Sequence, residues 1–368
     1  MNVPFLDVQA AYRELKDPID TAVMRVLESG WYILGEEVEQ FEKVFASYSG
    51  ADHCVGVGNG LDALVLGLTA LGIGSGDEVI VPANTYIATW LAVSAVGATC
   101  VPVDPDENGC NLNLDIVEKL ISDKTCAIIP VHLYGHPMDV VRTKALADEH
   151  GLKVIEDCAQ AHGAKWQGIS VGSTSDVGCY SFYPGKNLGA LGDGGAVVTS
   201  DADVADKLRL LRNYGSKQKY SNDVKGANSR LDSVQAAVLK VKLDWLDEWN
   251  ERRSKIAHRY VESFEAISNL KVFSEPQGSQ SVWHQFPIRT ERRDKLQEVL
   301  NHSGIGTMIH YPVPPHLSEA YQSERLDNFS LPVTEKSAAE LLSLPIGPHL
   351  SEQQQSYVIA TVIDFFKE

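Results

Sequence analysis

The chain has 368 residues, of which 44% are hydrophobic and 22% charged, enough for a sizeable core and for two domains or one large domain with an appendage. Its net charge of −17 argues against a nucleic-acid-binding surface, which needs a basic patch. No apolar run approaches the roughly 20 residues of a membrane span, and the start MNVPFLDVQ does not resemble a signal peptide, so we expect a cytoplasmic protein. Six scattered cysteines without a C-x-x-C pair are expected to be buried thiols rather than disulfides or metal ligands.

Up to about residue 200, short apolar runs typical of buried strands alternate with helical patterns. This order predicts an α/β domain with a mostly parallel sheet. Helices are expected between the strands, for example at Leu61–Leu71 and Ile116–Ile121. The expected strands are Cys54–Val57, Val79–Val81, Cys100–Val103, Cys126–Val131, Val154–Glu156, Val177–Phe182 and Ala196–Thr199.

The pattern changes after Asn228. Apolar residues recur every three or four positions from Asp232 to about Ile267 and predict one long helix that bridges two domains. We therefore expect a large α/β domain over residues 1–245 and a smaller C-terminal α+β domain over residues 246–368. The smaller domain should contain Val282–Ile288, Leu296–Leu300, a turn at Gly304–Gly306 and a closing helix from Ser351.

The most informative segment is SFYPGKNLGALGDGGAVVTS, in which Lys186 lies in a glycine-rich turn between two apolar runs. Pro184 and Gly185 end the first run, because proline offers no backbone donor and its φ suits a turn. The amine is expected to leave the end of a core strand and point into a site. Partial desolvation there eases loss of its proton, and the neutral amine can form a Schiff base with an aldehyde cofactor. The alternative is a solvated turn lysine that balances Asp193.

A second candidate, HCVGVGNGLDALVLGL, joins a strand to a helix through glycines. Gly58, Gly60 and Ala63 satisfy the G-x-G-x-x-A fingerprint, so a nicotinamide oxidoreductase is one alternative. That fingerprint needs an acidic residue at the end of the next strand, whereas Asp77 precedes it. The more general prediction is a phosphate cradle made by the backbone N–H groups of Gly60 and Leu61 at a helix N-terminus. A plain strand-to-helix turn is the other alternative.

A third candidate is LKVIEDCAQAHG, in which a buried strand ends at Glu156 and Asp157. Ligands of α/β sheets bind at the carboxyl ends of strands, and a carboxylate there can keep a pyridine nitrogen protonated. The alternative is that Asp157 only caps the following segment. His162 is expected to be a packed and hydrogen-bonded histidine, since no second histidine lies at metal-ligand spacing.

A lysine amine, a phosphate cradle and a carboxylate at the strand ends of one domain are the groups that pyridoxal 5′-phosphate (PLP) requires. Along essentially its whole length the chain resembles the sugar aminotransferases of the DegT/DnrJ/EryC1/StrS family, which are fold type I PLP enzymes. The resemblance therefore implies a fold type I PLP-dependent transferase. Its motifs here are SGWYILGEEVEQFE, PANTYIAT, VHLYGHPMD, EDCAQAHGA, SFYPGKNLGALGDGGAVVT, NSRLDSVQAAVL and IHYPVPPH.

The resemblance assigns roles around the cofactor ring. It implies that Lys186 binds PLP as a Schiff base and carries the proton, and that Asp157 faces the pyridine nitrogen. Gln160 would contact the ring hydroxyl, and Tyr86 would stack on the ring face. Family members that act as dehydratases carry histidine at the position of Lys186, so this lysine favours transamination.

The resemblance also assigns the phosphate. The backbone of Gly60 and Leu61 and the hydroxyl of Ser181 would hold it. Asn228 resembles the residue that reaches the phosphate of the neighbouring subunit, which implies a homodimer with a shared active site.

For the substrates, Tyr183, His310 and Tyr311 resemble residues that line the sugar-nucleotide pocket, although each is equally explained as a half-buried side chain without a ligand. No arginine clearly serves the donor carboxylate, and Arg230 is a candidate. The run YPGKNLGALGDGGA resembles enzymes that aminate C3 of dTDP-linked 3-keto-6-deoxyhexoses, with glutamate the expected amino donor. The alternatives are a 4-aminotransferase, an enzyme of UDP-linked sugars, a nicotinamide oxidoreductase and a catalytically silent regulatory homologue.

Overall fold

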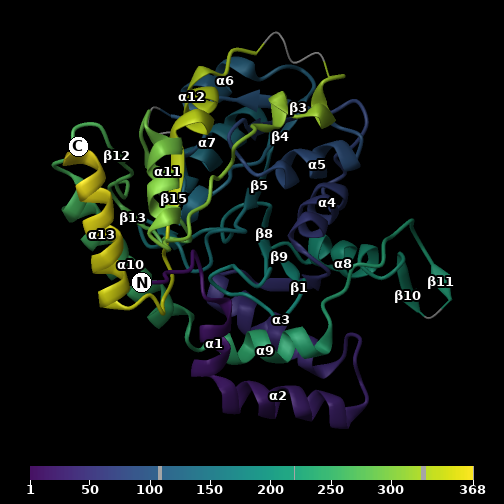
Figure 1. Ribbon diagram of the computed structural model, residues 1–368. Helices are drawn as coiled ribbons and strands as arrows, with labels where there is room; N and C mark the ends of the chain where they lie inside the picture. Colours follow the sequence, from purple (N-terminus) through teal and green to yellow (C-terminus); the bar gives the residue numbers. More distant parts are fainter. Residues whose placement is uncertain (107–109, 219, 325–328, 368) are drawn as a thin grey trace.

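A seven-stranded sheet lies at the centre of the computed structural model, which describes residues 1–106, 110–218, 220–324 and 329–367 (Figure 1). In their order across the sheet the strands are β1 (His53–Val57), β9 (Gly195–Thr199), β8 (Val177–Ser181), β5 (Lys153–Asp157), β4 (Thr125–Ile128), β2 (Glu78–Pro82) and β3 (Thr99–Val103). β9 runs antiparallel to both of its neighbours, whereas β8, β5, β4, β2 and β3 are parallel. The predicted mostly parallel sheet is confirmed, with strand bounds shifted by one to three residues.

Helices bury both faces of this sheet, because successive strand residues point to opposite sides. On one face Val55 and Val79 pack against α4 (Gly60–Ala70), α5 (Ile87–Ala95) and α8 (Ala202–Leu211). On the other face Cys54 and Ile80 lie in clusters with residues of α3, α6, α7 and α9. These four helices are α3 (Glu36–Ser49), α6 (Leu114–Leu120), α7 (Val140–His150) and α9 (Ser233–Leu243). Because helices cover both faces of the sheet, a site can form where the strands end.

A second apolar core lies beside the first, around a three-stranded antiparallel sheet in the order β12-β14-β15. Val3 belongs to this core and forms a bridge with Ile305, so the start of the chain joins its C-terminal part. The α+β layout expected after residue 245 is observed, and the domain boundary itself stays a prediction. The elements are α10 (Leu246–Phe264), β12 (Lys271–Val272), β14 (Phe286–Arg289), α11 (Arg293–His302), α12 (Pro332–Glu340), β15 (Leu341–Leu344) and α13 (Glu352–Lys367).

The single long helix predicted from Asp232 to Ile267 is wrong. The chain forms α9 and α10 instead, with Asp244 and Trp245 between them. The amide of Trp245 donates to the carbonyl of Lys242, three residues back, at 3.1 Å, and its φ of −108° and ψ of −5° differ from the ideal α-helical values. The sequence conceals this break because Trp245 and Trp249 continue the four-residue apolar spacing through it.

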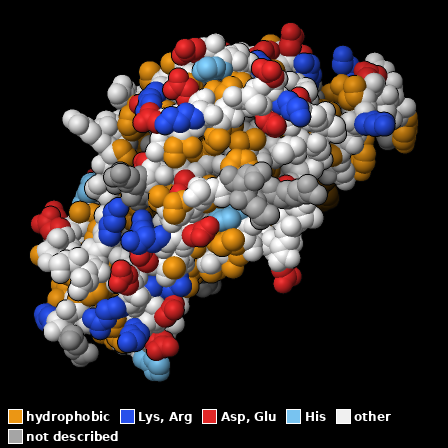
Figure 2. All heavy atoms as spheres, turned by 90° about the horizontal axis from the view of Figure 1, so that it is seen from above, with side chains coloured by type: hydrophobic (Ala, Val, Ile, Leu, Met, Phe, Trp, Pro, Cys, Tyr) orange, Lys and Arg blue, Asp and Glu red, His pale blue; other side chains and the backbone are white. Residues whose placement is uncertain are grey.

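Smaller elements complete the fold. A hairpin of β10 (Ser216–Gln218) and β11 (Ser221–Asn222) protrudes on the side away from α13 (Figure 1). On the face drawn in Figure 2, acidic and basic side chains are interspersed with apolar ones. In the described part of the chain, no helix has the length and apolar character that crossing a membrane requires. All six cysteines are free and five are buried, as expected. The remaining elements are α1 (Val8–Glu14), α2 (Lys16–Ser29), η1 (Leu133–Gly135), β6 (Lys165–Trp166), β7 (Ile169–Ser170), β13 (Ser279–Gln280), η2 (Pro315–Leu317) and η3 (Glu319–Tyr321).

Candidate active site

Lys186 lies in the loop that joins β8 to β9. The loop is closed by backbone hydrogen bonds from Phe182 to Gly194 (2.7 Å) and from Ala190 to Phe182 (2.8 Å), so the lysine emerges from a rigid base. Its side chain is half-buried. Burial lowers the pKa of Lys186 to about 8, against the opposing effect of the Asp157 carboxylate. Near neutral pH a useful fraction of the amine is therefore uncharged and nucleophilic.

Asp157 ends β5 and faces the same site. It is only 7% exposed, and its two carboxylate oxygens accept from the Ala159 amide (3.1 Å) and the Thr89 hydroxyl (2.9 Å). Burial raises the pKa of Asp157, while the Ala159 amide, Thr89 and the charge of Lys186 oppose that rise. The local cap considered for Asp157 is thus present, and Thr89 and Lys186 show that the carboxylate also belongs to a buried polar cluster.

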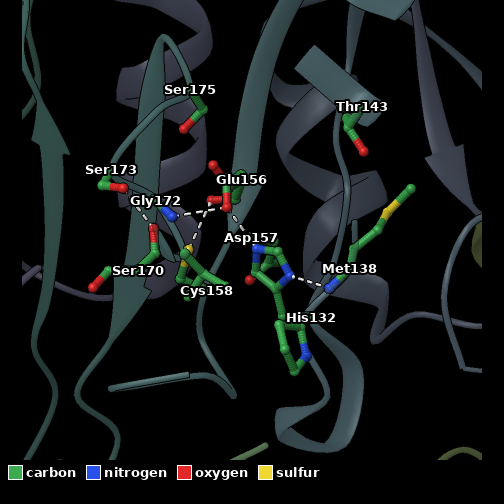
Figure 3. Close-up of polar contacts among 12 residues, drawn as sticks. His132, Met138, Thr143, Glu156, Asp157, Cys158, Ser170, Gly172, Ser173 and Ser175 are labelled. Atoms are coloured by element: carbon green, nitrogen blue, oxygen red, sulfur yellow. Dashed lines mark hydrogen bonds and ion pairs between the residues drawn. The ribbon is translucent and has the colours of Figure 1, made fainter. Parts of the chain in front are cut away.

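Glu156, the residue before Asp157, is hydrogen-bonded to the ring of His132 (Figure 3). The His132 Nδ1 accepts from the Met138 amide at 3.0 Å, so in the neutral ring Nε2 carries the proton and donates to Glu156 at 2.7 Å. The Gly172 amide donates to the same carboxylate oxygen at 2.7 Å. Cys158 lies in this cluster, but hydrogen bonds occupy the His132 nitrogens and the Glu156 oxygen, and we assign no metal there. The pair ties the end of β5 to the segment after β4.

The segment after His132 positions Gln160 as well. The amide of Tyr134 donates to the Gln160 Oε1 at 2.6 Å, and the Gln160 Nε2 donates to the Tyr311 hydroxyl at 3.1 Å. The Tyr134 hydroxyl donates to the carbonyl of His310 at 2.7 Å. Tyr134 has a φ of +61°, a conformation that is uncommon for a non-glycine residue and concentrates at functional sites. Gln160, His310 and Tyr311 therefore meet at one side of the site.

At the predicted phosphate cradle, the start of α4 approaches the end of β8 closely. α4 begins at Gly60, and the Asn59 side chain caps it by accepting from the Asp62 amide at 2.8 Å. The amides of Gly60 and Leu61 belong to the first turn, where no intrahelical acceptor exists. A Cβ on Gly60 would lie 2.5 Å from the Cβ of Ser181, so only glycine leaves the helix N-terminus and this serine side by side.

The predicted ring-stacking and substrate positions carry aromatic side chains. Tyr86, 53% exposed, precedes α5, and its ring centroid lies 5.1 Å from that of Tyr311. Tyr183 is 60% exposed and belongs to the Lys186 loop, where its carbonyl accepts from the Lys186 amide at 2.8 Å. His310 is buried, and its Nδ1 lies 2.9 Å from the Ser343 hydroxyl. The candidate substrate residues thus come from two separate segments of the chain, and Tyr86 comes from a third.

Asn228 and Arg230 follow the protruding hairpin. Asn228 is exposed and bridges to Asn213 in its own chain. Arg230 donates to the Asn213 side chain at 2.9 Å and lies 5.6 Å from the ring of Tyr214, while its Nε finds no hydrogen-bond partner in the described residues. Between these two residues, the Ser229 hydroxyl accepts from the Gly58 amide at 2.9 Å. The segment is thereby anchored next to the cradle.

His162 is packed as predicted, but the expectation that its ring is hydrogen-bonded is wrong. Both ring nitrogens are buried without a hydrogen-bond partner among the described residues, and the ring packs 5.4 Å from Tyr180 and 5.8 Å from Phe182. Burial and the charge of Lys186 lower its pKa to about 3, although the Ser181 backbone lies close enough to oppose the shift. Because burial and the charge of Lys186 hold this pKa far below neutrality, His162 is neutral.

The sequence matches the DegT/DnrJ/EryC1/StrS aminotransferase family over residues 13–363. The chain belongs to this family of aminotransferases. A relative from Streptomyces venezuelae, dTDP-3-amino-3,4,6-trideoxy-alpha-D-glucose transaminase, is 55% identical over 333 residues, which cover 90% of this chain and 88% of the relative.

Two solved structures resemble this aminotransferase closely. The crystal structure of DesV from S. venezuelae in complex with a ketimine intermediate has a TM-score of 0.98 and 54% identity, covering 100% of this chain and 99% of DesV. NtdA from Bacillus subtilis with bound cofactor PMP has a TM-score of 0.94 and 31% identity, covering 100% of this chain and 86% of NtdA. The predicted family, fold class and enzyme class are confirmed.

Sequence reasoning missed several residues that shape the site of this aminotransferase. Thr89 and His132 lie in the motifs PANTYIAT and VHLYGHPMD, which were singled out, but spacing alone does not reveal which side chains reach Asp157 or Glu156. Tyr134 could have been found only through its backbone conformation. These residues act through the tertiary fold and leave no local pattern.

Proposed function

We propose that this chain is a PLP-dependent aminotransferase that moves an amino group from an amino acid, with glutamate the expected donor, to C3 of a dTDP-linked 3-keto-6-deoxyhexose. The observation that carries the proposal is the convergence of the Lys186 amine, the Asp157 carboxylate and the Gly60 cradle at strand ends of one sheet. The cradle that a Cβ would fill is the fit that a phosphate requires. Bound PLP would supply an electron sink for the carbon that loses its proton.

Each residue of the site would have a role that follows from its chemistry. Lys186 would hold the cofactor covalently and, once displaced by the donor amine, would take a proton from one carbon and return it to another. Its pKa of about 8 suits both directions, since proton transfer is efficient when the pKa of the catalyst lies near the working pH. Asp157 would pair with the ring nitrogen, and Gln160 would contact the ring hydroxyl.

The phosphate would accept from the amides of Gly60 and Leu61 and from the Ser181 hydroxyl, where the positive end of the α4 dipole adds to the attraction. Tyr86 would cover the ring face. Tyr183, His310 and Tyr311 would line the sugar-nucleotide pocket, and Arg230 remains the candidate for the donor carboxylate.

We further propose a homodimer with shared active sites in the cytoplasm. The hairpin of β10 and β11 protrudes from the body, and Tyr220 at its turn is 90% exposed. Trp31, Tyr32 and Ile33 are 66%, 49% and 44% exposed, and contiguous exposed apolar residues are typical of an interaction surface. Asn228, which follows the hairpin, would reach the phosphate bound by the partner subunit.

The substrate is tested by incubating the PLP-loaded protein with glutamate and a panel of keto sugar nucleotides that vary in nucleotide, ketone position and configuration. We expect an amino sugar with nitrogen at C3, identified by mass spectrometry and NMR, and no product with Lys186→Ala. An amine at C4, or a UDP-linked sugar as the preferred substrate, would replace the proposed substrate. Tight NADH binding without PLP binding would instead support the oxidoreductase alternative, and the absence of any product would support the regulatory one.

The shared site is tested by mixing two inactive variants, Lys186→Ala and Asn228→Asp. If sites are shared, hybrid dimers contain one intact site, and a random mixture should regain about a quarter of wild-type activity. No activity in the mixture, with hybrid dimers present, would show that each site is complete within one chain.

A further inference from the structure

Two threonine hydroxyls are linked to Asp157 by consecutive hydrogen bonds. The Thr89 hydroxyl donates to the Asp157 Oδ2 at 2.9 Å, and the hydroxyl oxygen of Thr85 lies 3.0 Å from that of Thr89. All three side chains are buried, so water does not compete for these bonds. The two hydroxyls and the carboxylate therefore have to satisfy one another.

The direction of both bonds follows from the charge of Asp157. An ionised carboxylate can only accept, so Thr89 uses its single hydroxyl hydrogen on Asp157. The bond between the two threonines must then use the hydrogen of Thr85, with the Thr89 oxygen as acceptor. If a protonated Asp157 donated to Thr89 instead, Thr89 would donate to Thr85, and the hydrogen of Thr85 would need another acceptor. None is found among the residues that the structure describes, so the threonine pair favours the ionised carboxylate.

The Thr89 hydroxyl has an alternative to Asp157. Thr89 is the third residue of α5, and a threonine hydroxyl in a helix can donate to a carbonyl of the preceding turn. Other helical threonines of this chain donate to the carbonyl four residues back, namely Thr21, Thr69, Thr143 and Thr361. A hydrogen bond from Thr85 to the Thr89 oxygen disfavours that rotation, because the rotated hydroxyl would lose it.

The same bond closes the start of α5, beside Tyr86. Tyr86 follows Thr85 and is the N-cap of the helix, where its side chain makes no capping hydrogen bond. The Thr89 amide donates to the Tyr86 carbonyl at 3.2 Å, and the bond between the two threonine hydroxyls spans the same turn. One pair of hydroxyls thus joins the segment of Tyr86, predicted to stack on the cofactor ring, to the carboxylate predicted to face the ring nitrogen.

We propose that Thr85 is a positioning residue for Asp157: its hydroxyl donates to Thr89 and thereby keeps the Thr89 hydroxyl directed at the carboxylate. This inference deepens the proposed function and rests on it, because Asp157 must be ionised there to keep the ring nitrogen protonated. Thr85 itself touches neither cofactor nor substrate and acts through Thr89.

The carboxylate needs such support because it is buried. Burial raises the pKa of Asp157, and the Ala159 amide, the Thr89 hydroxyl, Lys186 and His132 oppose that rise. A hydroxyl that accepts a hydrogen bond becomes a stronger donor, so Thr85 strengthens the contribution of Thr89. Burial raises the pKa values of the other titratable groups that interact with Asp157, so they stay uncharged near neutral pH; these are Cys158, Cys179 and Tyr311.

The test measures the pKa of Asp157 in cofactor-free protein from the pH dependence of its carboxyl carbon signal in NMR, with Asp157→Asn used to assign the signal. Thr85→Val keeps the shape of the side chain and removes the hydroxyl, and it should raise this pKa by about half a unit. Thr89→Val removes the bond to the carboxylate itself and should raise it by about one unit. Thr85→Ser retains the hydroxyl and should retain the wild-type pKa.

The double variant Thr85→Val, Thr89→Val distinguishes positioning from a merely structural role. If Thr85 acts through Thr89, the double variant should have the same Asp157 pKa as Thr89→Val alone. The matched control is Thr199→Val, because Thr199 is also buried and its hydroxyl donates to the Asp176 carbonyl at 2.8 Å. An unchanged pKa in a folded Thr85→Val, additive shifts in the double variant, or an equal shift in Thr199→Val overturns the proposal.

A measurement on the wild-type protein keeps the proposal testable if Thr85→Val does not fold. The hydroxyl protons of Thr85 and Thr89 are shielded from water, and their NMR signals should both shift at the pH at which Asp157 titrates. A Thr85 proton that does not follow this titration contradicts the assignment. Covalent capture of PLP on Lys186 by borohydride tests the proposed function separately, because the NMR titrations contain no cofactor.

Discussion

Replacing Gly60 by alanine tests the predicted phosphate cradle independently of Lys186 and Asp157. The added Cβ would lie 2.5 Å from the Ser181 Cβ and 3.1 Å from its hydroxyl oxygen. Ordinary contact between carbon atoms begins near 3.5 Å, so the start of α4 and β8 must separate by about 1 Å. Overpacking of this kind costs about 1–3 kcal/mol, and the lower flexibility of alanine in the unfolded chain offsets about 0.4–1 kcal/mol of that.

The same displacement should weaken PLP binding. It moves the first-turn amides of α4 away from the Ser181 hydroxyl, so the phosphate can no longer reach all of these donors. Loss of one hydrogen bond to a charged group is worth about 1.5–3 kcal/mol, which corresponds to about a 10- to 100-fold rise in Kd. We expect this rise in Gly60→Ala, together with a lower free energy of unfolding for the cofactor-free protein.

The assay is an absorbance titration of cofactor-free protein with PLP, with urea unfolding measured in parallel. Gly74→Ala is the matched control, because its Cβ would meet only the Val96 carbonyl at 3.5 Å, an ordinary contact. The double variant Gly60→Ala, Ser181→Gly removes the clashing Cβ, so it should regain stability without regaining affinity. Wild-type affinity and stability in Gly60→Ala, or an equal loss in Gly74→Ala, would refute the reasoning.

Three further predictions concern charge and protonation. Cofactor-free protein should form a Schiff base with PLP at a rate that rises with pH and levels off above about 8, because only the neutral amine of Lys186 attacks. A rate that stays constant between about pH 6 and 9 would contradict this expectation. Glu42→Ala leaves the buried Arg212 without its carboxylate partner and should cost about 3–5 kcal/mol in urea unfolding, and a loss below about 1 kcal/mol would show that the pair is not needed. Thr89→Val removes a hydrogen bond that lowers the pKa of Asp157, so this pKa should rise further. The acid limb of the pH–activity profile should therefore move to higher pH, and kcat should fall a few-fold (~1 kcal/mol). An acid limb that does not move would exclude this role for Thr89.

The local order of strands and turns was predictable because it depends on neighbours in the sequence. Short apolar runs bounded by glycine and proline located all seven strands of the large sheet. The break at Trp245 was not predictable in this way, because the apolar spacing continues through it while the backbone does not. Periodicity reports which side of a helix is buried, and it cannot report whether the hydrogen-bond ladder is interrupted.

The candidate site likewise contains residues that the sequence predicted and residues that it did not. The amino-acid types and motifs were sufficient to identify Lys186 and Asp157 as candidates, since an amine after a core strand and a carboxylate at a strand end each have few explanations. The supporting residues Thr89 and His132 come from distant segments that meet Asp157 and Glu156 only after folding.

The sequence by itself determined the family, the parallel-sheet architecture and the chemical groups that a PLP enzyme needs, because these depend on residue type and local spacing. Only the tertiary structure decided how those groups are tuned. Burial lowers the pKa of Lys186 and raises that of Asp157, and the Thr89 hydroxyl donates to the Asp157 carboxylate. Desolvation and bond direction are properties of packed surroundings, so they exist only once the distant segments are in contact.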